Sequence, residues 1–320
     1  MKSNNKCKAQ SAFKKLGAVA LITATLAVFF TACNRTGGGG GKPTPTPTPN
    51  PPTQQGTAIL TLSPNKLNIK VTAKTEDDSA ITVEGCTETT LASDTETTLH
   101  ARGTTVILKG KITELSCGGN KLAALNVQGL TSLQYLNCYN NQLTELNMQG
   151  CASLQKLYCT YNQLTALDVQ GLTALQTLSC SVNQLPELNV QGLTALQQLY
   201  CSENQLPELN VQGLASLEEL GCGGNQLTSL NVQDCTSLRR LYCTENKLNA
   251  QAMTALLNAL PAREAGDNAT VFLYTEQTDI TEGNCKDFTN PPELKAALDG
   301  AKSKNWKLQK IDASGNEVEI

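Results

Sequence analysis

Cysteine is the residue whose number and spacing in this sequence could do chemistry. The 320-residue chain has 13 cysteines, and seven of them follow one another at intervals of 21 residues. They are Cys117, Cys138, Cys159, Cys180, Cys201, Cys222 and Cys243. Such a set could form disulfides, bind a metal or supply a thiol nucleophile, and the choice depends on the elements that position the thiols.

Other reactive residues are few. His100 is the single histidine, so a multi-histidine metal site is excluded and any catalytic triad would depend on this one residue, for which we expect a structural role. The segment GCGGN at 221–225 lacks the lysine and the following helix of a phosphate-binding loop. Glu218 and Glu219 are adjacent, so in a strand they point to opposite sides and form no acid–base couple. The sequence therefore predicts no enzyme, no cofactor and no metal site.

The interval of 21 residues is shared by other residue types. Asparagine recurs three residues after each of the seven cysteines, beginning with Asn120, and leucine recurs two residues before them, beginning with Leu115. A further leucine ladder begins with Leu122. Four ladders in phase identify residues 112–248 as an internal repeat of the pattern L-x-x-L-x-C-x-x-N-x-L.

Each repeat contains one short predicted strand. In L-x-C, the two apolar side chains point to one side and the flanking polar residues to the other, as strand alternation requires. The asparagine that follows can both donate to and accept from buried backbone groups of a turn, so we expect its role to be structural. The second half of the repeat has no helical spacing and predicts an extended or tightly turned side. Gly150 and Gly171 fit turns there that need a positive φ, and Asp234 replaces such a glycine.

The repeat resembles the leucine-rich-repeat motif, with cysteine in place of the third aliphatic residue. The resemblance covers residues 112–248 in about seven copies. It implies a repeat solenoid, a right-handed parallel β-solenoid in which one short strand per repeat lines a concave face.

Stacked repeats decide between the possible roles of the cysteines. Neighbouring strands lie about 4.8 Å apart, whereas a disulfide brings its Cβ atoms to about 3.8 Å, and the C-x-x-C pairs typical of zinc sites are absent. We therefore expect a column of unlinked, buried thiols that pack as small hydrophobic groups, with partial disulfides and metal binding as the alternatives. Cys151 and Cys235 occupy leucine positions and are expected in the core. Cys86 and Cys285 lie outside the repeats and could pair.

Tyrosine behaves differently from cysteine, because it falls at variable positions in or just after the predicted strands. Six of the seven tyrosines do so: Tyr135, Tyr139, Tyr158, Tyr161, Tyr200 and Tyr242. The alternative explanation is that tyrosine is common in strands of any kind. These tyrosines, however, are confined to outward positions, among serine, asparagine and glycine. That composition is typical of adaptable recognition surfaces, because the ring offers contact area at little entropic cost. We predict that these tyrosines, with Lys156, Glu219 and Arg240, bind a partner.

The segments on either side of the repeats have their own patterns. Residues 58–110 contain short strand candidates at 58–62, 67–71, 80–85, 97–101 and 104–110, and predict a β-rich cap over the apolar end of the array. Residues 249–320 predict an α/β cap, with helices at 250–260 and 291–303 and strands at 269–277 and 306–313. The repeats themselves are assigned to residues 111–248.

Residues 1–32 predict a secretory signal peptide, in which Lys14 and Lys15 precede an apolar run that ends at Ala32. The sequence FTAC resembles the lipobox of bacterial lipoproteins, although Phe30 stands where leucine is usual. This resemblance implies cleavage before Cys33 and attachment of lipid to that residue.

Residues 33–57 predict a linker, with five consecutive glycines followed by alternating prolines that favour an extended chain. The first 32 residues hold five lysines and no acidic residue, so their removal changes the net charge from -3 to about -8. An acidic mature chain argues against nucleic acid as the partner.

Taken together, these features resemble bacterial leucine-rich-repeat surface lipoproteins, whose members commonly act in attachment. The resemblance implies a non-enzymatic protein, lipid-anchored at the outer membrane or cell surface. Through its concave face it would bind a protein or glycan of a host or of other bacteria. The alternative is a periplasmic or envelope-scaffolding lipoprotein without a host partner. The sequence specifies neither the ligand nor the oligomeric state.

Overall fold

The computed structural model describes residues 56–320, which lie within one compact unit, Asn50–Ile320. The predicted signal peptide, Cys33 and nearly all of the predicted linker lie outside the described residues. Within 56–320, no helix combines the length and the apolar character needed to span a membrane. The predictions for the first 55 residues and the domain boundaries drawn from the sequence therefore stay predictions.

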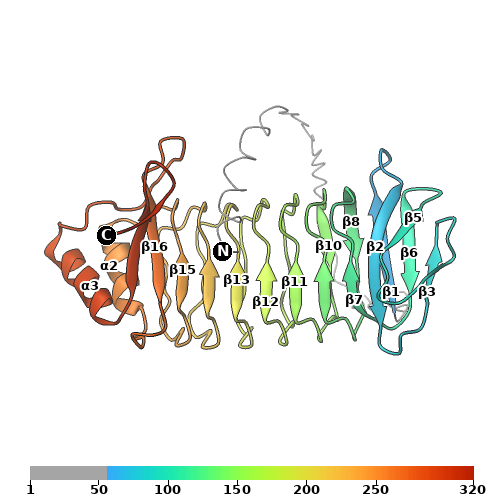
Figure 1. Ribbon diagram of the computed structural model, residues 1–320, viewed down its shortest axis with the longest axis horizontal. Coiled ribbons are helices and arrows are strands. Elements are labelled where there is room, and N and C mark those ends of the chain that lie inside the picture. The colour runs from blue at the N-terminus through green and yellow to red at the C-terminus, as the bar shows by residue number, and fades with distance from the viewer. Residues whose placement is uncertain (1–55) are drawn as a thin grey trace, which may run out of the picture. The chain divides into compact units, whose positions relative to one another are not determined.

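A twelve-stranded sheet places the strands of successive repeats side by side (Figure 1). Its repeat strands are β7 (Ile112–Ser116), β9 (Tyr135–Asn137), β11 (Lys156–Tyr158), β12 (Thr177–Ser179), β13 (Gln198–Tyr200), β14 (Glu219–Gly221) and β15 (Arg240–Tyr242). They pair in parallel and in register, so that Leu115 lies beside Leu136 and the row of leucines continues to Leu241. The constant register confirms the predicted parallel β-solenoid.

Antiparallel strands from residues 57–109 precede the parallel array, and one of the sheets that they join also contains two parallel strands from the first repeats. One six-stranded sheet has the order β10-β8-β1-β6-β3-β4. Its strands are β1 (Thr57–Leu62), β3 (Ile81–Glu84), β4 (Thr90–Leu91), β6 (Thr105–Lys109), β8 (Leu122–Asn126) and β10 (Glu145–Asn147). Both β2 (Asn68–Thr75) and β5 (Thr97–His100) join the long sheet, in which β2 pairs antiparallel with β7. The five strands expected between residues 58 and 110 are present, and β4 was not predicted.

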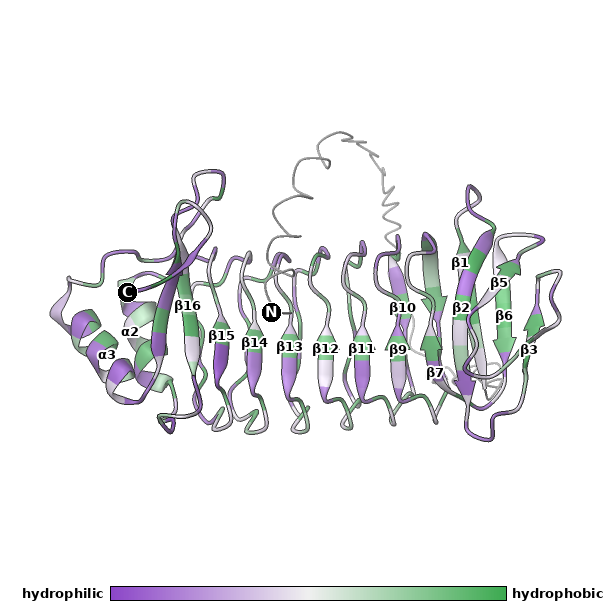
Figure 2. Cartoon of the chain, in the orientation of Figure 1, coloured by the Kyte–Doolittle hydropathy of each residue, from purple (hydrophilic) through white to green (hydrophobic). Residues whose placement is uncertain are grey.

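Two helix–strand units extend the long sheet after the repeats. They are α2 (Ala250–Ala259) with β16 (Thr270–Thr275), and α3 (Pro292–Ser303) with β17 (Lys307–Ile311). β18 (Glu317–Glu319) pairs antiparallel with β17 and ends the sheet. Figure 2 shows β16 as largely hydrophobic, beside the hydrophilic β15. Five of the six residues of β16 are buried, because this strand lies within the structure rather than at an open face.

Both helices follow from local sequence signals. Asn249 caps α2 by accepting a hydrogen bond from the backbone N of Ala252 at 2.9 Å. Met253, Leu256 and Leu257 then bury one face of α2 at the spacing of an amphipathic helix. In α3, proline occupies the first turn, where its missing N–H leaves no helical bond unmade.

Leucine and cysteine fill the interior of the repeats. The seven ladder leucines and the seven ladder cysteines are all 0% exposed. Every cysteine among residues 56–320 is a free thiol, which confirms the predicted column of unlinked, packed thiols. Cys151 and Cys235 are buried in leucine positions, as expected. Cys86 and Cys285 are also free, so the pairing considered for them is not formed.

Six of the seven ladder asparagines join their repeat to the preceding one, and the first, Asn120, instead bonds the backbone of Lys70 in β2. The Nδ2 of Asn162 donates to the carbonyls of Cys159 and Cys138, at 2.9 and 3.1 Å. Its Oδ1 accepts from the backbone N of Leu143 at 3.0 Å. The same three contacts recur at Asn183, Asn204, Asn225 and Asn246. Buried backbone groups thereby gain partners, which confirms the structural role predicted for the ladder.

Asn284 continues the asparagine ladder beyond the repeats. Its Nδ2 donates to the carbonyls of Cys243 and Leu273, both at 2.8 Å, and its Oδ1 accepts from the backbone N of Leu248 at 2.9 Å. It lies 11 residues after Leu273, whereas a repeat asparagine lies 3 residues after its cysteine. The regular spacing therefore could not have revealed it.

Every repeat contains two positions that need a positive φ. On the turned side these are glycines, including Gly150 and Gly171, and Asp234 takes the same conformation, as predicted. The second position lies two residues after each ladder cysteine. Glycine occupies it only at Gly119 and Gly224, and the other occupants are Asn140, Tyr161, Val182, Glu203 and Glu245.

Candidate functional site: the strand face

The outward side chains of the repeat strands form a continuous surface, called the strand face below. It comprises the residues on either side of each ladder leucine in β9 and β11–β15, and the residue after each ladder cysteine. The structure places eight of the nine predicted binding residues on this face: Tyr135, Tyr139, Lys156, Tyr158, Tyr200, Glu219, Arg240 and Tyr242. Tyr161 lies instead in the turn after β11, with φ of 57°.

At the first repeats, tyrosine rings lie close to one another and to a glycine. The ring centroids of Tyr135 and Tyr158 are 5.7 Å apart, with the planes tilted by 48°. Tyr139 is 48% exposed, and its ring lies against Gly118 of the preceding repeat. A Cβ atom at Gly118 would come 2.5 Å from Cδ1 of Tyr139, so the ring takes the space that a side chain would need.

A hydrogen-bonded trio occupies the middle of the strand face. The phenol of Tyr200 donates to Oε2 of Glu219 at 2.5 Å, and Nη1 of Arg240 donates to Oε1 of the same carboxylate at 3.1 Å. Burial, and next this bond to Glu219, raise the pKa of the Tyr200 phenol well above its usual range. Both carboxylate oxygens accept a hydrogen bond. Glu219 on β14 therefore holds a tyrosine on β13 and an arginine on β15, the two strands that flank its own.

At the last repeats, Tyr242 stacks on Phe272, with ring centroids 4.8 Å apart and planes within 6°. Phe272 lies opposite Tyr242 in the register of β15 and β16, and it is 4% exposed. Sequence reasoning missed Phe272 because β16 does not follow the 21-residue interval. Val271 pairs with the ladder leucine Leu241, so Phe272 holds the same position in its strand as Tyr242 does in β15. An apolar residue followed by an aromatic one in the strand after the repeats is the signal that could have identified Phe272.

The thiol column offers no nucleophile at neutral pH. Burial raises the pKa of Cys117 and Cys201 to about 12, and raises the pKa of Cys159 well above its usual range. Reaction requires the thiolate and access to it, and a buried thiol with a raised pKa has neither.

The histidine and the acidic pair singled out from the sequence form hydrogen bonds or ion pairs with neighbouring side chains. His100 Nδ1 lies 2.7 Å from Oε1 of Glu88, and the backbone N of His100 donates to Oε2 at 2.8 Å. The backbone bond, and next the ring bond, lower the pKa of Glu88 to about 2. Glu218 pairs with Arg239 at 2.6 Å, not with Glu219. Among residues 56–320, no three histidine, cysteine, aspartate or glutamate side chains are placed to hold a metal ion.

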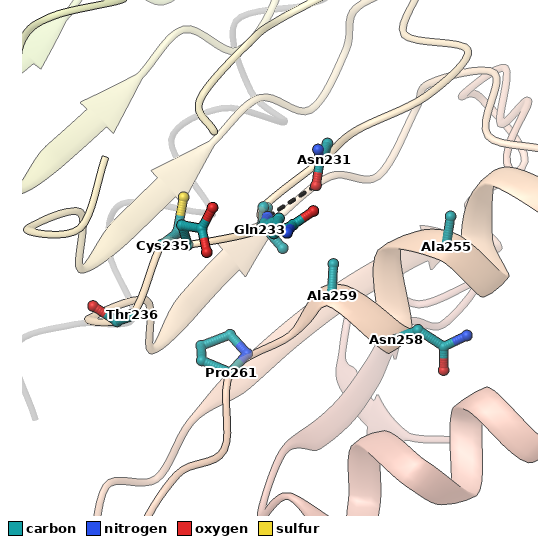
Figure 3. A pocket seen from close by; sticks show the side chains of 10 residues that line it. Asn231, Gln233, Cys235, Thr236, Ala255, Asn258, Ala259 and Pro261 are labelled. Atoms are coloured by element: carbon teal, nitrogen blue, oxygen red, sulfur yellow. Dashed lines mark hydrogen bonds between the residues drawn. The ribbon is translucent and has the colours of Figure 1, made fainter. Parts of the chain in front are cut away.

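A shallow hollow of about 740 Å³ lies between α2 and the turned side of the last repeat (Figure 3). Asn231, Gln233 and Thr236 line one side, and Ala255, Asn258 and Ala259 of α2 line the other. No pair of its lining side chains forms an acid–base or nucleophile–base arrangement, and it lies away from the strand face.

Comparison with known proteins gives fragmentary likenesses. No protein-family model and no curated protein matches the chain. The functional domain of InlJ from Listeria monocytogenes, which includes a cysteine ladder, is 30% identical over 42% of this chain and 40% of that chain, with a TM-score of 0.33. A leucine-rich-repeat protein of Leptospira interrogans is 25% identical over 56% of this chain and 49% of that one, with a TM-score of 0.41. YopM, a leucine-rich effector protein from Yersinia pestis, is 23% identical over 42% and 49%, with a TM-score of 0.34.

The chain thus spans less than half the length of each of these three structures, and TM-scores this low carry no argument on function. The fold is assigned from the chain's own geometry: parallel strands one repeat apart, an inward leucine and cysteine on each, and an asparagine that bonds two repeats. The protein is a leucine-rich-repeat solenoid with a 21-residue repeat and a cysteine ladder.

Proposed function

We propose that this chain is a lipid-anchored surface protein of bacteria that binds a partner through the strand face and performs no reaction. In this proposal, Cys33 carries the lipid, the Gly- and Pro-rich linker holds the solenoid away from the outer membrane, and the partner is a protein or glycan of a host or of another bacterium. Attachment is the role that these properties suit.

The observation that carries the proposal is the gathering of tyrosines on one face of a continuous sheet. Tyr139 and Tyr242 are 48% and 38% exposed, although their rings contact neighbouring residues that hold them in place. A ring held in place before binding loses little entropy on contact, which favours affinity. The interior ladders account for the fold without these tyrosines, so their presence calls for another explanation.

Replacement of Tyr158 and Tyr200 by alanine tests the strand face. Binding of the labelled full chain to fixed epithelial cells and to bacterial cells should fall about ten-fold or more, because aromatic anchors dominate such interfaces. The thermal unfolding profile should stay unchanged. Glu187→Ala with Glu208→Ala is the matched control, since both residues are exposed on the turned side. Unchanged binding by the tyrosine variant would move the site away from the strand face.

Protease treatment of intact cells separates the surface role from a periplasmic or envelope-scaffolding role. A surface protein would be cut in its proline-rich linker and released, whereas a periplasmic protein would survive. Survival would favour the scaffolding role.

A further inference from the structure

Three tyrosines occupy the same strand position in every second repeat. Tyr158, Tyr200 and Tyr242 each follow a ladder leucine, and the strands between them carry Ser179 and Gly221 at that position. Because neighbouring strands lie about 4.8 Å apart, the positions of successive tyrosines in this row are about 9.6 Å apart. The residues between them are small, and the Tyr200 ring takes the space beside Gly221, where a Cβ atom would come 3.2 Å from its Cδ1.

Two of the three strands between the outer tyrosines, β12 and β13, present uncharged polar groups, whereas β14 carries Glu219. β12 and β13 place Ser179, Gln198 and Tyr200 on the strand face, where Thr177 is only 6% exposed, and Ser181 and Ser202 follow their ladder cysteines. The hydroxyls of Thr160 and Ser179 lie 2.7 Å apart, and Thr177 donates to Oε1 of Gln198 at 3.3 Å. Surfaces of small domains are usually about 25–35% charged, so an outward patch of hydroxyls and one amide is a specific feature.

Charge returns only at the borders of this patch, and part of it is neutralised there. Lys156 lies on the strand before it, and Glu219 and Arg240 on the strands after it are paired with each other. A charged partner would find no complementary patch of charge in the centre. A neutral partner needs no such charge, so it could cover the centre of the patch without leaving a charged group unpaired.

Large aliphatic side chains are nearly absent from the exposed surface of residues 56–320. The large apolar side chains that are exposed in 56–320 are Tyr139, Tyr161, Tyr242 and Val318, and Val318 lies in β18, away from the repeats. The apolar contacts available on the strand face are therefore aromatic rings. The core of a protein–protein interface also uses aliphatic side chains and is enriched in methionine, which this face does not present.

From these observations we infer that the strand face binds a neutral, extended, β-linked polysaccharide that runs along the solenoid axis. In such a chain, alternate sugar rings face the same way, and two sugar residues span about the distance between successive tyrosines of the row. The rings of Tyr158, Tyr200 and Tyr242 contact the apolar faces of alternate sugars, and the hydroxyls and amide of β12 and β13 bond the sugar hydroxyls. This inference rests on the proposed function, because it names the partner class of the same face.

Titration of the full chain with neutral hexasaccharides tests the partner class. Cellohexaose and chitohexaose are the β-1,4-linked probes, and maltohexaose, whose α-1,4 links coil the chain, is the linkage control. Calorimetry should detect binding of at least one β-linked probe, with maltohexaose at least about ten-fold weaker, which corresponds to about 1.4 kcal/mol. Equal binding of maltohexaose, or binding of none of the probes, would overturn the inference.

A variant that moves one ring by a single repeat tests the spacing. Tyr200→Ser combined with Ser179→Tyr keeps the composition of the strand face and breaks the two-repeat interval. Affinity for the β-linked probe should fall about ten-fold or more, whereas the single change Glu187→Ala on the exposed turned side should leave it unchanged. Denaturant unfolding of all variants confirms that each is folded. Undiminished affinity of the ring-shifted variant would overturn the inference.

The outcomes separate the inference from the proposed function. If the alanine variant of Tyr158 and Tyr200 loses cell binding but no hexasaccharide binds the unchanged chain, the partner is a protein and only the inference fails. If the alanine variant binds cells as the unchanged chain does, both fail.

Discussion

The interior of the repeats and the strand face differ in how strictly they repeat. The inward ladders that begin at Leu115, Cys117 and Asn120 hold one residue type throughout, whereas the position after the ladder leucine changes from each strand to the next. An inward side chain packs against its own copies one strand above and below, so a change of size in one repeat disturbs two others. An outward side chain meets solvent and is free of that constraint. The interior therefore specifies the fold, and the strand face distinguishes this chain from others with the same fold.

Alkaline pH should disrupt the interior and has the largest expected effect. Burial raises the pKa of Cys117 and Cys201 from the ordinary 9.0 to about 12, so the folded state keeps protons that the unfolded chain loses. The stability contributed by such a thiol is complete below its unfolded pKa and is lost as the pH rises through its folded pKa. The seven ladder thiols are all buried and act in the same direction, so their ionisation opposes a stability that is typically only about 5–15 kcal/mol.

Circular dichroism at graded pH should therefore show cooperative loss of structure between pH 9 and about 12, the window set by these two thiols. As a control, Cys201→Ala should make the free energy of unfolding fall less steeply with pH. A free energy of unfolding that stays constant across this window would contradict the burial of the thiols.

Removal of one ladder asparagine should have the next largest effect. Asn162→Ala leaves the backbone N of Leu143 without its partner and takes a donor from two buried carbonyls. The carbonyls of Cys138 and Cys159 keep donors from Asn141 and Asn183, so one buried group is left unsatisfied, and the free energy of unfolding should fall by about 2–3 kcal/mol. Chemical denaturation measures it.

The matched control for the asparagine lies on the turned side. Asn147 is exposed; its Oδ1 accepts from the backbone N of Gln149 at 3.1 Å, and its Nδ2 donates to the Oε1 of Gln128 at 3.2 Å, so no buried group depends on it. Asn147→Ala should cost about 1 kcal/mol. Equal costs at the two asparagines would mean that the interior ladder has no special role.

Relief of backbone strain should have a smaller effect, of opposite sign. Val182 has φ of 55°, a conformation that costs a residue with a Cβ atom about 1–2 kcal/mol. Val182→Gly removes this cost and adds chain entropy to the unfolded state, so the melting temperature should rise by the equivalent of about 0.5–1 kcal/mol. Gly224→Ala, at the equivalent position with φ of 66°, should lower it. A lower melting temperature for Val182→Gly would show that packing of the valine outweighs the strain.

The smallest effect is expected for a surface ion pair. Arg239 and Glu218 meet at 2.6 Å, but their side chains are 42% and 39% exposed. Arg239→Ala should change the free energy of unfolding by less than about 1 kcal/mol, since exposed pairs contribute little. A larger loss, measured by denaturant titration, would show that outward residues also stabilise the array.

Some of the candidate site could be read from the sequence, and some could not. The 21-residue interval and strand alternation identified Tyr158, Tyr200 and Tyr242 as outward residues. The same reasoning gave no account of Gly118, and for Gly221 it only excluded a phosphate loop, yet these glycines provide space for the rings of Tyr139 and Tyr200. Such a fit joins residues of different repeats and depends on rotamers, which a one-dimensional pattern does not contain.

By itself, the sequence determined the parallel stacking, the inward column of thiols and the structural asparagines. A repeat that packs against its own copies must have the same residue types at the same interval, and that interval is visible in the sequence. Only the tertiary structure decided what happens where the interval ends. Asn284 bonds the last repeat from a loop, Phe272 supports Tyr242 from β16, and Glu219 joins Tyr200 to Arg240 across three strands. These contacts unite residues that share no period, so their partners are fixed by proximity in the folded chain rather than by spacing along it.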